Sequence, residues 1–214
     1  MHWTPCTWIQ TASGKKLDYI KPDPDAITIE DIATGLARLG RFANQTTQFY
    51  SVAEHSWRVT NFVRERGGST FEQLVALLHD APEAYAMDLP RPLKILWPGY
   101  ALIEERLWAV ISRKLLGEVV EQLPPVVRYC DELALATEAR DLFVGGPVEN
   151  WSQSLPGPDA ATIIPLGMQQ ARVVFMSRYT SLVLQPGKGG QEQTANLNHP
   201  LVNSCGGQET SADS

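Results

Sequence analysis

The spacing of the apolar residues constrains the fold of this chain more than any other feature. In several segments between Thr28 and Leu184 these residues recur every three or four positions, which places them on one face of a helix. Such segments begin at Thr28, at Ser51, at Phe71, after Pro98, after Pro125 and near Gly167. Because 214 residues with 43% hydrophobic side chains can bury one substantial core, we predict an all-α helical bundle in a single domain, residues 1–185.

Pairs of polar residues mark the starts of two of these helices. Ser51 is followed three residues later by Glu54, and Thr70 is followed in the same way by Gln73. This spacing is typical of a capping box, in which the two side chains satisfy free backbone N–H groups at the start of a helix. A capping box is therefore expected at both positions.

Three segments depart from the helical pattern. Residues 8–11 and 16–20 flank Ser13-Gly14 and predict a short N-terminal β-hairpin. Residues 146–164 are rich in proline and glycine and are long for a connection, so they either cover a site or are disordered. Residues 186–214 contain almost no large apolar side chain, so a disordered tail is expected there, and His199 within it is not an expected ligand.

Charge and composition argue against several classes of protein. The net charge of −6 is opposite to the basic surface that holds a nucleic-acid backbone. No apolar run reaches the roughly 18 residues that a membrane span requires, and residues 1–6 do not resemble a secretory signal. The cysteines Cys6, Cys130 and Cys205 are too far apart to suggest a disulfide framework or a zinc site. We expect a cytoplasmic protein with neither a nucleic-acid nor a membrane partner.

Four ligand-type residues, His55, His79, Asp80 and Asp131, provide the chemistry. Two imidazoles and two carboxylates can hold a divalent cation and leave one coordination position free for water. Adjacent helical residues point about 100° apart, so His79 and Asp80 converge on one ion where a helix ends, as Pro82 suggests. Alone, His55 reads as a satisfied core histidine and Asp131 as a surface carboxylate. Asp131, however, lies on an otherwise apolar helix and needs a partner such as a cation.

Longer segments around these residues carry a family resemblance. Residues 50–56 surround His55, residues 77–85 contain the His-Asp pair, and residues 88–94 follow it. Together they resemble the HD-domain phosphohydrolases, and more closely the compact bacterial and phage nucleotide hydrolases of that superfamily. The resemblance covers roughly residues 7 to 183. It implies an HD-type helical domain in which His55, His79, Asp80 and Asp131 bind a divalent metal ion, with Co²⁺, Mn²⁺, Zn²⁺ and Mg²⁺ all open.

Two further carboxylates are candidate catalytic residues. Glu83 lies four residues after His79 and three after Asp80, so it shares their face if that turn is helical. Otherwise it is an exposed helix glutamate. The resemblance implies that Glu83 activates the attacking water or protonates the leaving alkoxide. Asp88 matches a second acidic position of these enzymes, and its alternative is a turn-forming residue before Leu-Pro.

Three cations are candidate substrate-binding residues: Arg41, Lys94 and Arg91. A guanidinium can grip a phosphate through two hydrogen bonds, and an ammonium supplies a mobile point charge. Solvated surface charge is the alternative for each, above all for Arg91. Three cations exceed what a monophosphate requires, which favours a triphosphate substrate.

The resemblance implies metal-dependent hydrolysis of a small-molecule 2′-deoxynucleotide by a homo-oligomer. The first choice is a deoxynucleoside triphosphate triphosphohydrolase of the dATP type, which releases deoxynucleoside and triphosphate. The alternative is a 5′-deoxynucleotidase that releases phosphate from deoxynucleoside monophosphates. A hypothesis of another class is a non-catalytic nucleotide sensor, against which the presence of Glu83 and Asp88 argues.

Overall fold

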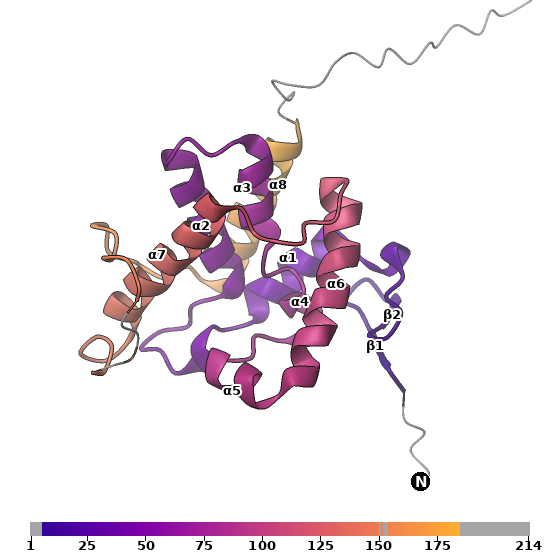
Figure 1. The fold of residues 1–214 in the computed structure, drawn as a ribbon, viewed down its shortest axis with the longest axis horizontal. Coiled ribbons are helices and arrows are strands. Elements are labelled where there is room, and N and C mark those ends of the chain that lie inside the picture. The colour runs from indigo at the N-terminus through magenta and orange to yellow at the C-terminus, as the bar shows by residue number, and fades with distance from the viewer. Residues whose placement is uncertain (1–5, 150, 152–153, 185–214) are drawn as a thin grey trace, which may run out of the picture.

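The computed structural model describes residues 6–149, 151 and 154–184, and the expected tail with His199 lies outside them. The described residues form a helical bundle with a small hairpin at its side (Figure 1), which confirms the all-α fold with an N-terminal hairpin. The elements are β1 (Trp8–Gln10), β2 (Lys16–Asp18), α1 (Ile29–Arg38), α2 (Val52–Glu65), α3 (Thr70–Leu78), α4 (Glu83–Ala86), α5 (Arg91–Leu96), α6 (Pro98–Leu116), α7 (Pro125–Leu142) and α8 (Met168–Leu184). Among these helices, none has the length and apolar character that a membrane crossing requires.

The hairpin is attached to the bundle through α1. Its strands are antiparallel, with Ile9 opposite Leu17, and the Leu17 side chain is fully buried. The backbone N–H and the hydroxyl of Ser13, in the hairpin turn, donate hydrogen bonds of 2.8 and 2.7 Å to the buried carboxylate of Asp31. Asp31 therefore connects the first turn of α1 to the hairpin, which closes one end of the hydrophobic core.

Helix α2 occupies the centre of the bundle and packs against α1, α3, α7 and α8. Its apolar face buries Val59 and Val63 completely, while Leu77 of α3 and Phe175 of α8 are fully buried beside it. Burying side chains of this size stabilises the fold by roughly 1.5–3 kcal/mol each. The helix that carries His55 is thus held from several sides.

The capping box of α3 is one residue earlier than expected. Ser69 is the N-cap residue, its hydroxyl accepts from the backbone N–H of Glu72 at 3.2 Å, and the Glu72 carboxylate accepts from the Ser69 N–H at 2.8 Å. Thr70 is instead the first helical residue, so the expected Thr70–Gln73 box is wrong, although the helix itself is confirmed.

At the start of α2 only half of the expected box forms. The Ser51 hydroxyl accepts from the Glu54 N–H at 3.2 Å, but the Glu54 carboxylate is fully buried and directed elsewhere. It accepts 2.7 Å hydrogen bonds from the Arg58 guanidinium and from the backbone N–H of Leu166. Glu54 thereby fixes the chain that precedes α8 against the helix that carries His55.

The described part of residues 146–164 is also tied to α7. The Asp159 N–H donates to the Thr137 hydroxyl at 2.9 Å, and the Ile163 N–H donates to the Asp141 carboxylate at 2.8 Å. Trp151 packs edge-on against Phe143, with ring centroids 5.3 Å apart. Of the two alternatives for this segment, these contacts favour a cover packed on the bundle.

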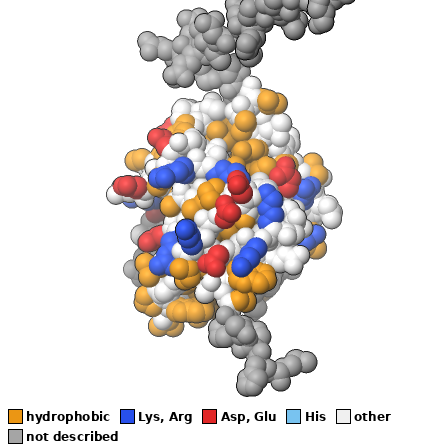
Figure 2. Space-filling model, turned by 90° about the vertical axis from the view of Figure 1, so that its right-hand side faces the viewer, with side chains coloured by type: hydrophobic (Ala, Val, Ile, Leu, Met, Phe, Trp, Pro, Cys, Tyr) orange, Lys and Arg blue, Asp and Glu red, His pale blue; other side chains and the backbone are white. Residues whose placement is uncertain are grey.

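The outer face over α6 and the hairpin carries mixed charge. Lys, Arg, Asp and Glu side chains are interspersed there among hydrophobic ones (Figure 2). Among the described residues on this face, neither sign of charge forms a continuous surface.

Candidate metal centre

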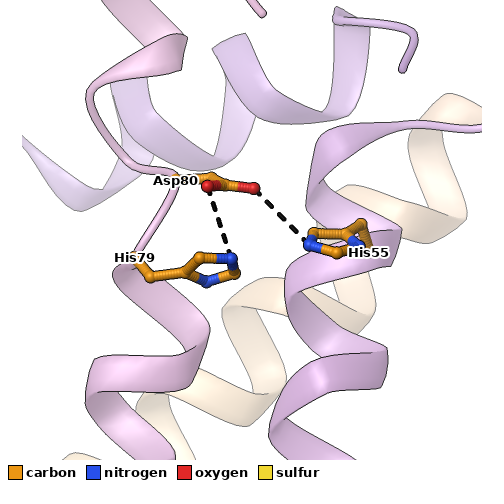
Figure 3. Close-up of side chains that lie close together, drawn as sticks. All are labelled: His55, His79 and Asp80. Carbon is orange, nitrogen blue, oxygen red and sulfur yellow. Dashed lines mark ion pairs between the residues drawn. The ribbon is translucent and has the colours of Figure 1, made fainter. Parts of the chain in front are cut away.

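The four expected ligand residues converge between three helices. His55 comes from the first turn of α2, His79 is the residue at which α3 ends, and Asp80 follows it. Ligand atoms of His55, His79 and Asp80 all lie within 4.8 Å of one another, and Asp80 faces both rings (Figure 3). Asp131 of α7 places its Oδ1 atom 3.1 Å from His55 Nε2 and 3.8 Å from His79 Nε2.

The end of α3 explains how adjacent residues reach one centre. The Ala81 N–H bonds to the Leu78 carbonyl at 2.8 Å, so the chain turns tightly after the last helical residue. His79 Nε2 and Asp80 Oδ1 thus come within 3.3 Å of each other. This is the geometry that the sequence requires of a His-Asp pair.

Both imidazoles direct their Nε2 atoms into the centre. The Nδ1–H of His79 donates to the Ala76 carbonyl at 2.8 Å, and Nδ1 of His55 lies 2.6 Å from Oε1 of Glu138. An ionised carboxylate only accepts, so His55 also carries its proton on Nδ1. Both Nε2 atoms are buried and lack a hydrogen-bond partner. Because buried polar atoms without partners are costly, this set of nitrogen and carboxylate donors fits a divalent cation.

The electrostatics of the centre favour a positive charge. Burial alone would raise the pKa of Asp131, but the neighbouring imidazoles of His55 and His79 hold it well below its usual range. Burial and the Arg41 charge would lower the pKa of His55, yet Glu138 and Asp131 raise it to about 10. Burial likewise acts to lower the pKa of His79, but the charges of Asp80 and Asp131 raise it.

Glu138 connects the centre to Arg41. Its carboxylate is fully buried, with Oε1 on His55 and Oε2 accepting from Arg41 Nε at 3.1 Å. Arg41 Nη1 lies 3.5 Å from Asp80 Oδ2, so the expected phosphate-binding guanidinium borders the ligand set. Glu138 was not among the expected site residues. Its position seven residues after Asp131 on α7, two helical turns along the same face, is the signal that could have found it.

The backbone beside Arg41 is strained. Phe42, Ala43 and Asn44 have φ values of 54°, 51° and 60°, in the left-handed region that costs roughly 1–2 kcal/mol per non-glycine residue. A Cβ atom at Gly40 would lie 1.8 Å from Asn44 Oδ1, so a larger residue there would displace the Asn44 side chain. Phe42 stacks edge-on against Phe143, with centroids 5.1 Å apart. These contacts fix the direction in which Arg41 leaves the chain.

A pocket of about 230 Å³ adjoins the centre. Its walls include His79 and Asp80 of the centre together with Glu83, Lys94, Glu104 and Trp108. Glu83 is 5% exposed, so it is not the exposed helix glutamate of the alternative interpretation. Burial raises the pKa of Glu83 well above its usual value, and the charges of Asp80 and Asp88 add to this.

Lys94 lies in this pocket but is already paired. Its ammonium is 3.3 Å from Glu83 Oε1 and 2.8 Å from Glu104 Oε1, and 5.5 Å from the centre of the Tyr100 ring. Glu104, from α6, was not among the expected site residues. A pair formed between α5 and α6 leaves no short-range signal in the sequence.

Asp88 and Arg91 are more peripheral. Asp88 is half-buried in the turn between α4 and α5, directly after Met87, whose φ is 75°. Burial raises the pKa of Asp88, the Arg41 charge opposes this rise, and the Asp80 charge adds to it. Arg91 is exposed at the first residue of α5 and is not among the described residues that line the pocket.

Comparison with known proteins places the chain among bacterial relatives. No protein-family model matches it. The uncharacterized protein YfdR of Escherichia coli (strain K12) is 40% identical over 181 residues, which cover 82% of this chain and 96% of YfdR. The uncharacterized protein RCAP_rcc00048 of Rhodobacter capsulatus is 42% identical over 189 residues, which cover 82% of this chain and 95% of the relative. With this identity over nearly the whole of both relatives, the chain belongs to the family of YfdR and RCAP_rcc00048.

Proposed function

We propose that this protein is a metal-dependent phosphohydrolase that acts on 2′-deoxynucleotides. The observation that carries the proposal is a pair of buried Nε2 atoms, on His55 and His79, that have no hydrogen-bond partner and face the carboxylates of Asp80 and Asp131. Arg41 lies against the same Asp80. A cation site beside a guanidinium is suited to a phosphate group.

The four candidate ligand residues would hold the cation. When bound, the cation would act as a Lewis acid that polarises a phosphoryl oxygen and lowers the pKa of water. Arg41 would orient the phosphate through its terminal nitrogens, because Glu138 occupies its Nε atom and only Nη1 also lies near a carboxylate, 3.5 Å from Asp80 Oδ2. Glu83 would exchange a proton with the attacking water or with the leaving alkoxide. Its Oε2 atom, which has no partner, is the atom free to do so.

The arrangement of the cations supports a single phosphate better than a triphosphate. Lys94 is held between two glutamates and Arg91 is exposed on α5, which leaves Arg41 as the cation beside the ligand set. Fewer cations than expected are therefore available to bind phosphate, which favours the 5′-deoxynucleotidase reaction. The triphosphohydrolase reaction is the second candidate, since Lys94 borders the same pocket as Asp80 and would reach a longer phosphate chain if Glu104 released it.

Turnover assays test the proposal directly. Purified protein is incubated with deoxynucleoside mono-, di- and triphosphates and with Mg²⁺, Mn²⁺, Co²⁺ or Zn²⁺, and the products are identified. Orthophosphate from monophosphates supports the first candidate, and tripolyphosphate from triphosphates supports the second. Tight metal and nucleotide binding without any turnover would contradict both and favour the sensor hypothesis.

A further inference from the structure

Most hydrogen-bond donors on the side chains that line the pocket beside the centre are already used within the protein. The Lys94 ammonium donates to Glu83 and Glu104 and lies 5.5 Å from the centre of the Tyr100 ring. The Trp108 Nε1–H donates to the Val120 carbonyl at 2.7 Å. The Nδ1–H of His79 is bound to the Ala76 carbonyl.

Acceptors, by contrast, remain available in the same pocket. The Glu83 side chain is buried, with 5% of its surface exposed, and its Oε2 atom has no hydrogen-bond partner. Glu104 uses one carboxylate oxygen on Lys94, and Glu105 adds a further carboxylate to the lining. A buried carboxylate oxygen without a partner is costly, so a ligand that donates to it gains the energy of a charge-assisted hydrogen bond.

A phosphate group does not complement such walls. A phosphate mono- or dianion offers mainly acceptor oxygens, and it would face acceptor oxygens of the same charge. A sugar hydroxyl or a base amino group donates hydrogen bonds and carries no charge. Burying either one against the free carboxylate oxygens satisfies atoms on both sides.

We propose that this pocket binds the uncharged part of the substrate through its hydroxyl and amino donors and excludes phosphate groups. The inference rests on the proposed function, and it assigns the phosphate to the Arg41 side of the centre and the deoxynucleoside to the pocket. At about 230 Å³ the pocket is smaller than most whole-ligand sites, which suits one portion of a substrate. Glu104 becomes a residue that determines specificity.

Calorimetric binding of phosphate-free deoxynucleosides tests the pocket without any turnover. The four 2′-deoxynucleosides, inorganic orthophosphate and tripolyphosphate are titrated into the wild type and into Glu104→Gln, which keeps the shape but replaces an acceptor by a donor. We expect Glu104→Gln to weaken deoxynucleoside binding about ten- to a hundredfold, the worth of one charge-assisted hydrogen bond. Orthophosphate affinity should remain the same. Glu118→Gln, on the exposed turn after α6, is the matched control.

Lys94→Met provides an independent readout, because it removes the cation and frees the carboxylates of Glu83 and Glu104. Deoxynucleoside binding should then be retained or strengthened, with orthophosphate affinity unchanged. Equal deoxynucleoside affinity in wild type and Glu104→Gln, no deoxynucleoside binding at all, or competition by tripolyphosphate for the pocket would each overturn the inference. Absence of nucleotide hydrolysis with selective deoxynucleoside binding would instead refute the proposed function and leave the pocket assignment intact.

Discussion

Replacing Glu138 by glutamine should weaken both metal binding and the fold, because one buried carboxylate serves two donors. Oε1 accepts from His55 Nδ1–H at 2.6 Å, and Oε2 accepts from Arg41 Nε–H at 3.1 Å. A glutamine side chain has a single carbonyl oxygen. Whichever way the amide is oriented, its NH₂ group faces a donor on the other side, and the Arg41 charge loses its buried counter-charge.

The expected magnitudes follow from this geometry. Removing one partner of a buried ion pair costs roughly 3–5 kcal/mol in the free energy of unfolding. Losing the group that orients a metal-bound histidine costs about 10- to 100-fold in metal affinity. We therefore expect Glu138→Gln to unfold at lower urea concentration and to bind the cation at least tenfold more weakly.

The pH dependence provides an internal check on the same variant. The charges of Arg41 and His55 lower the folded-state pKa of Glu138 below its ordinary 4.5, although its burial acts in the opposite direction. A carboxyl group whose pKa is lower in the folded than in the unfolded protein stabilises the fold at pH values above its unfolded-state pKa. This stabilisation is lost as the pH falls through the folded-state pKa. The difference in the free energy of unfolding between wild type and Glu138→Gln should therefore be largest at neutral pH and decrease below about pH 4.5.

The measurements are urea unfolding with and without metal, and metal affinity by competition with a chromophoric chelator. Glu121→Gln, an exposed glutamate before α7, is the control and should match the wild type. Metal affinity within threefold of wild type, together with an unchanged unfolding midpoint, would refute the reasoning.

Three further predictions concern the centre and its surroundings. Asp80→Ala should abolish both metal binding and turnover, since each ligand contributes to affinity, and a wild-type metal content measured by elemental analysis would contradict the assignment. Glu83→Gln should retain the cation but slow hydrolysis by roughly 10² to 10⁴, the range of general acid–base catalysis, whereas a rate within threefold of wild type would remove its role. Arg41→Ala should strongly reduce the hydrolysis of both dAMP and dATP, while Lys94→Ala should have little effect on the hydrolysis of dAMP. A large Lys94→Ala defect confined to dATP, with tripolyphosphate as product, would favour the triphosphohydrolase.

The parts of the fold that could be predicted are those with local signals. The apolar spacing from Ile29 to Leu39 predicts α1, and a glycine after an apolar run predicts the end of α6 at Gly117, whose φ is 86°. The short helices α4 and α5 were not expected. Pro90, Pro92 and a positive φ at Met87 interrupt the periodicity there, so these turns depend on the packing around them.

Candidate site residues were predictable where the chemistry is local. The spacing of His79, Asp80 and Glu83 indicates a shared centre, and the structure brings these residues together. The state of Lys94 was not predictable, because its partner Glu104 belongs to another helix and the pair depends on how α5 and α6 pack. The capping box of α3 could not be placed from the sequence for a similar reason. Ser69–Glu72 and Thr70–Gln73 both satisfy the sequence pattern, and only the backbone conformation at the start of the helix decides between them.

The central position of α2 has a consequence for how the protein matures. Its candidate ligand His55 meets Asp131 only after α2 has packed against α7, a contact between segments far apart in the chain. Such long-range contacts form slowly because closing a long loop costs entropy first. The cation would then bind late in folding, to chains in which α7 already packs against α2. Its binding would shift the folding equilibrium toward this native packing by mass action.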